Sequence, residues 1–123
     1  TAELFAMIML KPELSGYKPP KFAPGDLVRH VRYHYRAVVV AHDPRCMAGE
    51  AWYQSNQTQP EKDQPWYHVL VHGSESITYP AESSLEPEES DEPIAHPLLN
   101  RFFSGFEEGR YQRNDVPWPD TNS

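Results

Sequence analysis

Six histidines and one cysteine are the residues of this 123-residue chain with the widest scope for metal or acid–base chemistry. His68 and His72 fall on the same face of one expected strand, but no third ligand stands at a spacing typical of tetrahedral zinc sites. The single Cys46 excludes an internal disulfide framework and a cysteine zinc site, and its expected role is that of a small buried apolar residue. The sequence therefore predicts neither a metal site nor a cofactor.

Other catalytic patterns are also missing from the sequence. There is no nucleophile motif, no glycine-rich phosphate loop and no paired-carboxylate arrangement. The acids gather instead between Glu86 and Pro93, where the composition is that of a linker. We therefore expect a protein that is not an enzyme.

A second group of chemically versatile residues runs from Arg29 to Arg36, where cationic side chains are interleaved with tyrosines. On a hairpin, alternate members would form one basic face, suited to phosphate and base contacts or to a protein interface. The alternative is a solvated hairpin whose cations pair with the acids of Glu86 to Glu92. The candidate DNA- or partner-binding residues are Arg29, Arg32, His34, Tyr35 and Arg36.

Charge is distributed unevenly along the chain. The formal net charge is −7, made up of +3 over residues 1–45, −3 over residues 46–80 and −7 over residues 81–123. Proteins that bind duplex DNA through its phosphates normally present a basic surface, because affinity comes largely from counterion release. The overall balance argues against tight DNA binding.

These residues must be positioned by strands, and Gln64 to Val71 is the strongest strand signal. Trp66, His68 and Leu70 would lie on one face and Tyr67, Val69 and Val71 on the other. Both rows are largely apolar, which favours a central strand paired with Arg36 to Ala41. The predicted structural core contains His30, Val39, Trp66, Tyr67 and His68.

The remaining pattern predicts a mainly β domain, a small curled antiparallel sheet or barrel. Further strands are expected from Leu27, from Tyr35 to His42, from Ser76 to Pro80 and, as a short closing strand, from Glu82 to Leu85, with a possible helical turn over Met47 to Gln54. Thirteen prolines make a helical bundle improbable on physical grounds, because proline breaks helix interiors. The expected organisation is an arm at 1–20, a barrel at 21–85, an acidic linker at 86–96, and a C-terminal helix with an aromatic tail at 97–123.

The two ends of the chain leave alternatives open. The apolar run Leu4 to Leu10 could be an added edge strand, a short helix or an arm that docks on a partner. Pro97 to Gly109 has the pattern of a helix with an apolar stripe. That stripe, Leu98, Phe102 and Phe106, would either cap the barrel or bind a partner. No apolar run reaches the length of a membrane span, so a cytoplasmic protein is expected; its oligomeric state is left open.

Several motifs together resemble those of the YccV-like family, also called heat-shock protein Q or the hemimethylated-DNA-binding domain, from about Phe22 to Trp118. His96-Pro97, the Phe pair and Gly109-Arg110-Tyr111 resemble the longer members, including the copy in certain F-box proteins. One departure is His34, where the family usually has Gly: if that Gly serves a turn with φ > 0, either His34 is strained or the turn differs here. Ala37 in place of a common Gly is a milder change. The carrying motifs are Gly25 to His30, Tyr33 to Val40, Asp43-Pro44 with Cys46, Gln64 to Val71 and Thr78 to Glu82.

The resemblance implies an SH3-like β-barrel and two possible roles. The first is a non-enzymatic module that binds protein partners and modulates ATP-dependent proteolysis or stress-linked protein turnover, the partner being such a protease or its substrate. The second is binding of hemimethylated DNA that affects a replication initiator. Because the charge balance disfavours tight DNA binding, the first role is our leading hypothesis.

Overall fold

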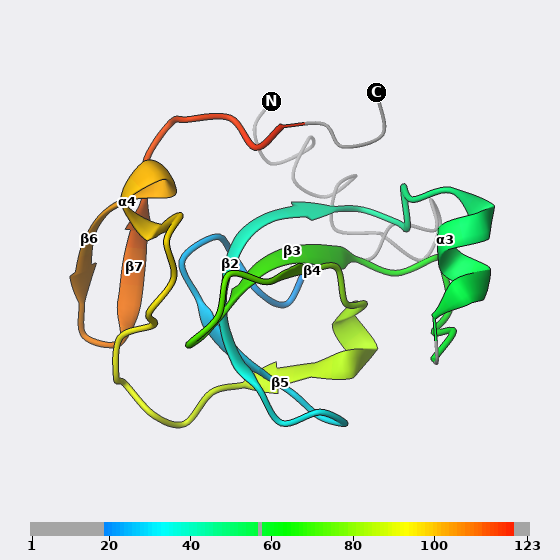
Figure 1. The fold of residues 1–123 in the computed structure, drawn as a ribbon, viewed down its shortest axis with the longest axis horizontal. Coiled ribbons are helices and arrows are strands. Elements are labelled where there is room, and N and C mark those ends of the chain that lie inside the picture. Colours follow the sequence, from blue (N-terminus) through cyan, green and yellow to red (C-terminus); the bar gives the residue numbers. More distant parts are fainter. Residues whose placement is uncertain (1–18, 57, 120–123) are drawn as a thin grey trace, which may run out of the picture.

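The computed structural model describes residues 19–56 and 58–119, and the apolar run Leu4 to Leu10 lies outside these ranges. Five antiparallel strands form one curled sheet in the order β4-β3-β2-β1-β5 (Figure 1). The expected mainly β fold is confirmed. The strands are β1 (Leu27–His30), β2 (Arg36–Asp43), β3 (Trp66–Val71), β4 (Ile77–Thr78) and β5 (Leu85–Pro87).

The predicted pairing of the two apolar runs is confirmed by the β2–β3 ladder. Val38 lies opposite Leu70 and Val39 opposite Val69, and the register shifts between Val39 and Ala41. Such an irregularity bends the strand and increases its twist, which is how a short sheet curls. Both strands are interior members of the sheet, as expected for strands that are apolar on both faces.

The alternation of β3 sends Tyr67 and Val69 to one face of the sheet and Leu70 to the other, into two separate apolar clusters, and its first residue, Trp66, packs in a third with Cys46 and Ala81. Tyr67 and Val69 belong to the inner cluster, and Leu70 belongs to the outer one. The inner cluster contains Phe22, Val28, Ala37, Val39, Tyr67, Val69 and Leu85. The outer cluster contains Leu27, Val38, Val40 and Leu70 from the sheet, and Ile94, Phe102, Phe103 and Tyr111 from the C-terminal segment.

The C-terminal helix predicted over Pro97 to Gly109 is wrong in its extent. The helix α4 covers only Leu99–Phe102, and a second, two-stranded sheet follows, made of β6 (Phe103–Glu107) and β7 (Arg110–Arg113). Glu108 and Gly109 join these strands with φ of 53° and 75°, the paired positive values of a type I′ hairpin turn. Gly109 thus makes a hairpin turn where the sequence analysis assigned it to a helix end.

Two connections complete the sheet. The long segment between β2 and β3 contains α3 (Glu50–Ser55), close to the expected helical turn. The expected closing strand from Glu82 to Leu85 is divided between a 3₁₀ turn, η1 (Glu82–Ser84), and β5. Within the described ranges, no helix has the length and apolar character needed to cross a membrane.

Candidate interaction site

The reversal between β1 and β2 is organised by the side chain of His30. The backbone N–H groups of Arg32 and Tyr33 both donate to His30 Nδ1, at 3.1 Å each. Burial lowers the pKa of His30, and the nearby positive charge of Arg32 lowers it further. His30 is therefore held as a neutral acceptor, the form that this turn requires.

His34, which stands where the family usually has Gly, has a strained backbone. Its φ is 65°, in the left-handed region, and its N–H donates to the carbonyl oxygen of His30 at 2.8 Å. An L side chain in this region crowds its own backbone, which glycine avoids. The exposed His34 side chain thus stands at the tip of the reversal on a backbone suited to Gly.

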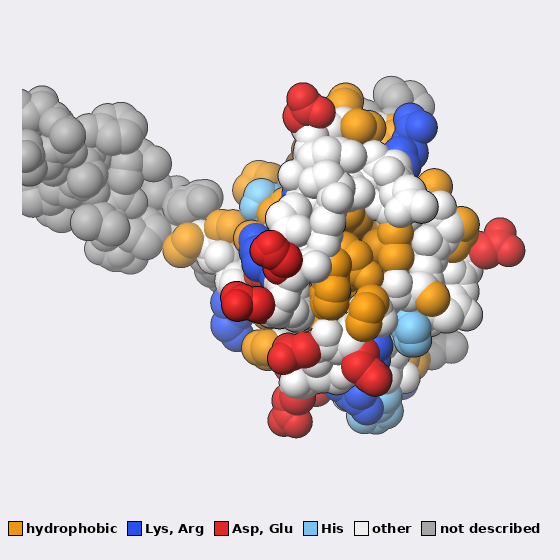
Figure 2. Space-filling view, turned by 90° about the vertical axis from the view of Figure 1, so that its left-hand side faces the viewer, with side chains coloured by type: hydrophobic (Ala, Val, Ile, Leu, Met, Phe, Trp, Pro, Cys, Tyr) orange, Lys and Arg blue, Asp and Glu red, His pale blue; other side chains and the backbone are white. Residues whose placement is uncertain are grey.

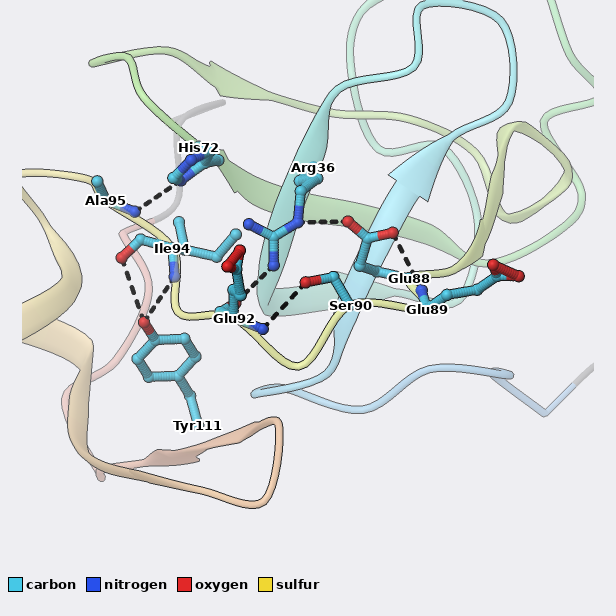
Figure 3. Close-up of polar contacts among 9 residues, drawn as sticks. All are labelled: Arg36, His72, Glu88, Glu89, Ser90, Glu92, Ile94, Ala95 and Tyr111. Atoms are coloured by element: carbon cyan, nitrogen blue, oxygen red, sulfur yellow. Dashed lines mark hydrogen bonds and ion pairs between the residues drawn. The ribbon is translucent and has the colours of Figure 1, made fainter.

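The candidate basic residues do not form one uniform cationic face. Arg32 and His34 are exposed at the tip, and Tyr35 is half-buried with its hydroxyl 2.8 Å from Thr78 Oγ1. Arg29 lies opposite Glu86 in the β1–β5 register. Arg36 forms an ion pair with Glu88 and donates to the backbone carbonyl oxygen of Glu92 (Figure 3). For Arg36, the alternative of pairing with the acidic segment is what the structure shows.

The acidic segment itself is bound to the sheet at several points rather than being simply solvated. The Glu88 side chain is only 5% exposed, beside Arg36. Farther along, the N–H of Ile94 donates to the Tyr111 hydroxyl, and the N–H of Ala95 donates to His72 Nδ1 (Figure 3). The composition of this segment predicted a solvated linker. It gives no sign of the partners that bind the segment, Arg36, Tyr111 and His72, because these come from other parts of the sequence.

The three residues of the expected C-terminal stripe all pack on the outer cluster. Phe102 is buried, and Leu98 and Phe106 are partly buried. They cover the outer face of the sheet rather than an open end of a barrel. Figure 2 looks onto the side formed by α4 and the β6–β7 hairpin, where apolar side chains gather in the middle and acidic ones lie around them.

A hollow that the sequence analysis did not identify lies at the β4 edge of the sheet. It is about 330 Å³ in volume and is bounded by α3, the β1–β2 reversal and the segment from Ile77 to Ser84. We call it the aromatic groove. Its lining residues are His30, Tyr33, Tyr35, Trp52, Asn56, Thr58, Pro60, Trp66, Ile77, Thr78, Tyr79, Pro80, Ala81 and Ser84.

The aromatic groove exposes large apolar side chains. Tyr33 is 48%, Trp52 38% and Ile77 44% exposed, although each lies in a folded part of the chain. No Lys, Arg, Asp or Glu belongs to the lining given above. A second hollow of about 400 Å³ shares Trp52, Ile77, Thr78 and Tyr79 with the groove and reaches Trp118. The lining combines aromatic rings with the neutral polar side chains of Asn56, Thr58, Thr78 and Ser84, and suits an uncharged ligand.

Ring contacts fix the floor of the groove. The Trp66 ring lies 5.4 Å from that of Tyr79 and 6.1 Å from that of Trp52. Trp66 itself is 2% exposed, and its indole N–H has no hydrogen-bond partner within the described residues. The floor of the groove is therefore preorganised, because its aromatic side chains pack against one another.

A polar cluster behind the groove holds Tyr79. Its hydroxyl donates to Asp43 Oδ2 at 2.6 Å, and His68 Nε2 lies 3.2 Å from the same oxygen. Burial raises the pKa of Tyr79, which keeps the hydroxyl a donor, and burial lowers the pKa of half-buried His68 although the charge of Asp43 opposes this. Across residues 19–56 and 58–119, no three His, Cys, Asp or Glu side chains are grouped as metal ligands. The cluster positions an aromatic ring.

The remaining predicted core residues have different degrees of burial. His30, Val39, Trp66 and Tyr67 are buried, whereas His68 is half-buried. Trp52, Ile77 and Tyr79 were not singled out from the sequence. Trp52 could have been noticed because it is a large apolar residue in a helix too short to bury it. Ile77 could have been noticed because it is an apolar residue on a very short strand.

Two comparisons with known proteins give matches over most of this chain. The family model described as "hemimethylated DNA-binding protein YccV like" matches residues 20–110. F-box only protein 21 from Pongo abelii, Homo sapiens and Mus musculus is in each case 33% identical to this chain over 96 residues. The matched region is 76% of this chain and 15% of the relative's length. The similarity therefore concerns one part of a much longer protein.

Proposed function

This chain belongs to the YccV-like family, and from that premise we propose that it is a non-enzymatic module whose aromatic groove binds a segment of a partner protein. The observation that carries the proposal is the exposure of Tyr33, Trp52 and Ile77 around a preformed, uncharged hollow. Tyrosine and tryptophan are enriched at protein interfaces because they supply a large contact area with few rotatable bonds.

The family resemblance extends this proposal to protein turnover. It implies a partner that is an ATP-dependent protease or its substrate, met in the cytoplasm. The similarity to part of F-box only protein 21 supports the idea of a module carried by longer proteins. An interaction domain is well suited to such use, because it presents a site on a rigid scaffold without needing catalytic groups.

The runner-up is binding of hemimethylated DNA through the β1–β2 reversal. The family description favours it, and Arg32 beside Tyr33 provides an exposed cation and ring. Against it, Arg36 is engaged by Glu88, and Glu86 lies opposite Arg29. Phosphate contacts would have to compete with these acids, so we expect weak DNA binding that falls steeply as salt increases.

To test the proposal, peptides that bind the full chain are selected from a displayed random library, and their affinities for the wild type and its variants are then measured. Selected peptides should bind the wild type and lose at least tenfold in affinity for Trp52→Ala and Ile77→Ser. Val31→Ser is a matched control, because Val31 is 43% exposed but does not line the groove. Equal binding to Trp52→Ala and wild type would contradict the proposed site.

A gel shift with unmethylated, hemimethylated and fully methylated duplexes at two salt concentrations tests the runner-up, DNA binding. Tight, methylation-dependent binding at physiological salt would reverse the ranking of the two functions.

A further inference from the structure

The aromatic groove and the second hollow lie on opposite faces of the five-stranded sheet. Tyr35, which lines the groove, packs against the inner cluster, whereas Trp118, which lines the second hollow, packs against the outer cluster. Both hollows are also lined by Ile77 and Thr78, the two residues of β4. Because β4 is an edge strand, the two hollows meet at an edge of the sheet.

Strand β4 carries backbone groups that the sheet does not use. The N–H of Val71, on β3, donates to the carbonyl oxygen of Ser76. In an antiparallel ladder only alternate residues bond to the neighbouring strand, so the N–H and C=O groups of Ile77 and Tyr79 point away from β3. Within residues 19–56 and 58–119, nothing forms a hydrogen bond with these outward groups. They are available to a further strand.

This edge also lacks the features that normally prevent pairing. Sheet edges are usually protected by charged side chains or prolines on the edge strand itself. Neither Ile77 nor Thr78 is of these types, and Ile77 is 44% exposed. The linings of the two hollows contain no Lys, Arg, Asp or Glu. A strand that entered them would leave any charge of its own without a partner, so the matching segment is uncharged.

Two hollows on opposite faces favour an extended occupant over a helical one. Successive side chains of a strand point to opposite faces of its sheet. A strand that continued the sheet beyond β4 would thus direct its side chains into the groove and into the second hollow in turn. A helix has its backbone groups bonded internally, so it would fill one hollow and leave the outward groups of β4 unpaired.

From these observations we propose that the partner segment binds as an added β-strand on the outer edge of β4, with alternate side chains in the aromatic groove and in the second hollow. This inference rests on the proposed function, because it specifies the conformation and chemistry of the segment that the groove binds. The segment is extended and uncharged over about five residues, the length from Ile77 to Ala81. Main-chain hydrogen bonds supply affinity, and the two hollows select the side chains.

The two hollows differ in the side chains that they accept. Besides the residues that both share, the groove adds the neutral polar side chains of Asn56, Thr58 and Ser84. The second hollow adds Ala48, Gly49 and Trp118. We therefore expect aromatic or neutral polar side chains at the positions that enter the groove, and apolar ones at the positions between them.

The first test uses the selected peptides of the previous section with the wild-type chain. Each analogue in a series carries one N-methyl group, which removes one backbone donor. Methylation at alternate positions should weaken binding about tenfold or more, because those N–H groups bond to β4. Methylation at the intervening positions, whose N–H groups point to solvent, should have little effect. Losses at consecutive positions, or at none, would overturn the inference.

The second test removes the outward donor of β4. Ile77→Pro deletes the N–H that points away from β3, a change that an edge strand tolerates. Ile77→Ala is the matched control, since it removes the same side chain but keeps the N–H. We expect the peptides to bind Ile77→Pro about tenfold more weakly than Ile77→Ala. Equal affinities of two folded variants would overturn the inference; if Ile77→Pro does not fold, the N-methyl series decides, because it needs no change in the protein.

Gly49 allows a test of the second hollow by itself. Its φ of −68° and ψ of 159° suit any residue, and a Cβ there would meet nothing within 4 Å. Gly49→Leu should narrow the hollow and weaken binding about fivefold or more, whereas the control Gly49→Ala adds only the Cβ. The loss should disappear for peptides that carry Ala at the positions entering this hollow. A loss that persists in those peptides would overturn the two-hollow arrangement.

The remaining outcomes separate this inference from the proposed function and from self-association. Alternation in the N-methyl series together with loss in Trp52→Ala supports both proposals. Loss in Trp52→Ala without alternation contradicts the inference and retains the proposed function. Binding that ignores Trp52→Ala removes the proposed site and the inference with it. A dimer in sedimentation that Ile77→Pro dissociates would overturn the inference in favour of β4 pairing between two copies of this chain.

Discussion

At the scale of single residues, His34 shows how a strained backbone can be recognised in a sequence. Its φ of 65° is in a region where an L residue costs roughly 1 to 2 kcal/mol. The motif anticipated this, because the family usually has Gly between the two tyrosines. No long-range contact had to be known, since the constraint lies in the reversal itself.

His34→Gly should therefore stabilise the fold. Relief of strain is partly offset by the greater backbone entropy of glycine in the unfolded chain, so we expect a net gain of up to about 1 kcal/mol in the free energy of unfolding. Urea denaturation measures it. His34→Ala is the control, because it removes the imidazole but keeps the strained L geometry. A gain of equal size in His34→Ala would assign the effect to the side chain.

His30 predicts a pH dependence of stability. Its pKa in the folded state is lowered from 6.5 by burial, so the unfolded chain binds the proton more readily. The contribution of neutral His30 is full above pH 6.5 and is lost as pH falls through the folded pKa, with a slope of up to about 1.4 kcal/mol per pH unit for one proton. Denaturation midpoints at pH 7.5, 6.5, 5.5 and 5.0 would record the loss.

His30→Asn isolates this contribution from that of the other titrating groups. The Asn oxygen can accept the N–H groups of Arg32 and Tyr33 in place of Nδ1, but it does not titrate. The difference between the two stability curves should thus shrink or reverse in favour of His30→Asn at acidic pH. Two parallel curves would mean that His30 is not the source.

At the scale of elements, the ion pair between β2 and the acidic segment stabilises a connection that composition alone leaves free. The Arg36 and Glu88 side chains are 16% and 5% exposed, so neither charge is well solvated. The sequence allows such pairing as an alternative but does not select the pair, because 52 positions separate the two residues. Only the folded arrangement of β2 and the acidic segment brings Arg36 and Glu88 together.

Arg36→Met should leave the Glu88 carboxylate buried without its partner and lower the free energy of unfolding by about 3 to 5 kcal/mol. Replacing both residues, as Arg36→Met with Glu88→Gln, should recover much of this loss, because no uncompensated charge remains. A double-mutant cycle in chemical denaturation gives the coupling. Additive effects of the two changes would show that the pair contributes no specific interaction.

The C-terminal elements show why a short apolar pattern misled the helix prediction. Phe102, Phe103 and Phe106 satisfy helical spacing, yet the hairpin places Phe106 opposite Tyr111 in the β6–β7 register. Only the contact with Tyr111 and the outer cluster selects the strand. By contrast, β2 and β3 were predictable because both of their faces are apolar over most of their length, a pattern that few other structures permit.

At the scale of the whole molecule, the hairpin is a second layer over the sheet. The N–H of Tyr111 donates to the carbonyl oxygen of Gly25, whose φ is 102°, and Arg110 pairs with Asp26 in the same turn. A Cβ at Gly25 would overlap the carbonyl oxygen of Tyr111. Pro24-Gly25-Asp26 has the composition of a turn, but its function as the docking point of the hairpin could not be predicted from sequence, because that contact joins opposite ends of the domain. The aromatic groove escaped prediction for the same reason, since it is assembled from α3, β3, β4 and the β1–β2 reversal.

Truncation after Ser90 tests whether this layer is structural. It would expose Leu27, Val38, Val40 and Leu70, each worth roughly 1.5 to 3 kcal/mol of burial, a loss on the order of 6 to 12 kcal/mol. Small domains are stable by about 5 to 15 kcal/mol in total, so the truncated chain should show no cooperative thermal transition above room temperature. Tyr111→Phe is a milder variant that keeps the layer but removes the hydroxyl bonded to both backbone groups of Ile94, and it should cost about 1 to 3 kcal/mol. If the truncated chain instead kept the wild-type melting temperature and lost only its peptide binding, the C-terminal segment would be a docking surface and not a layer of the fold.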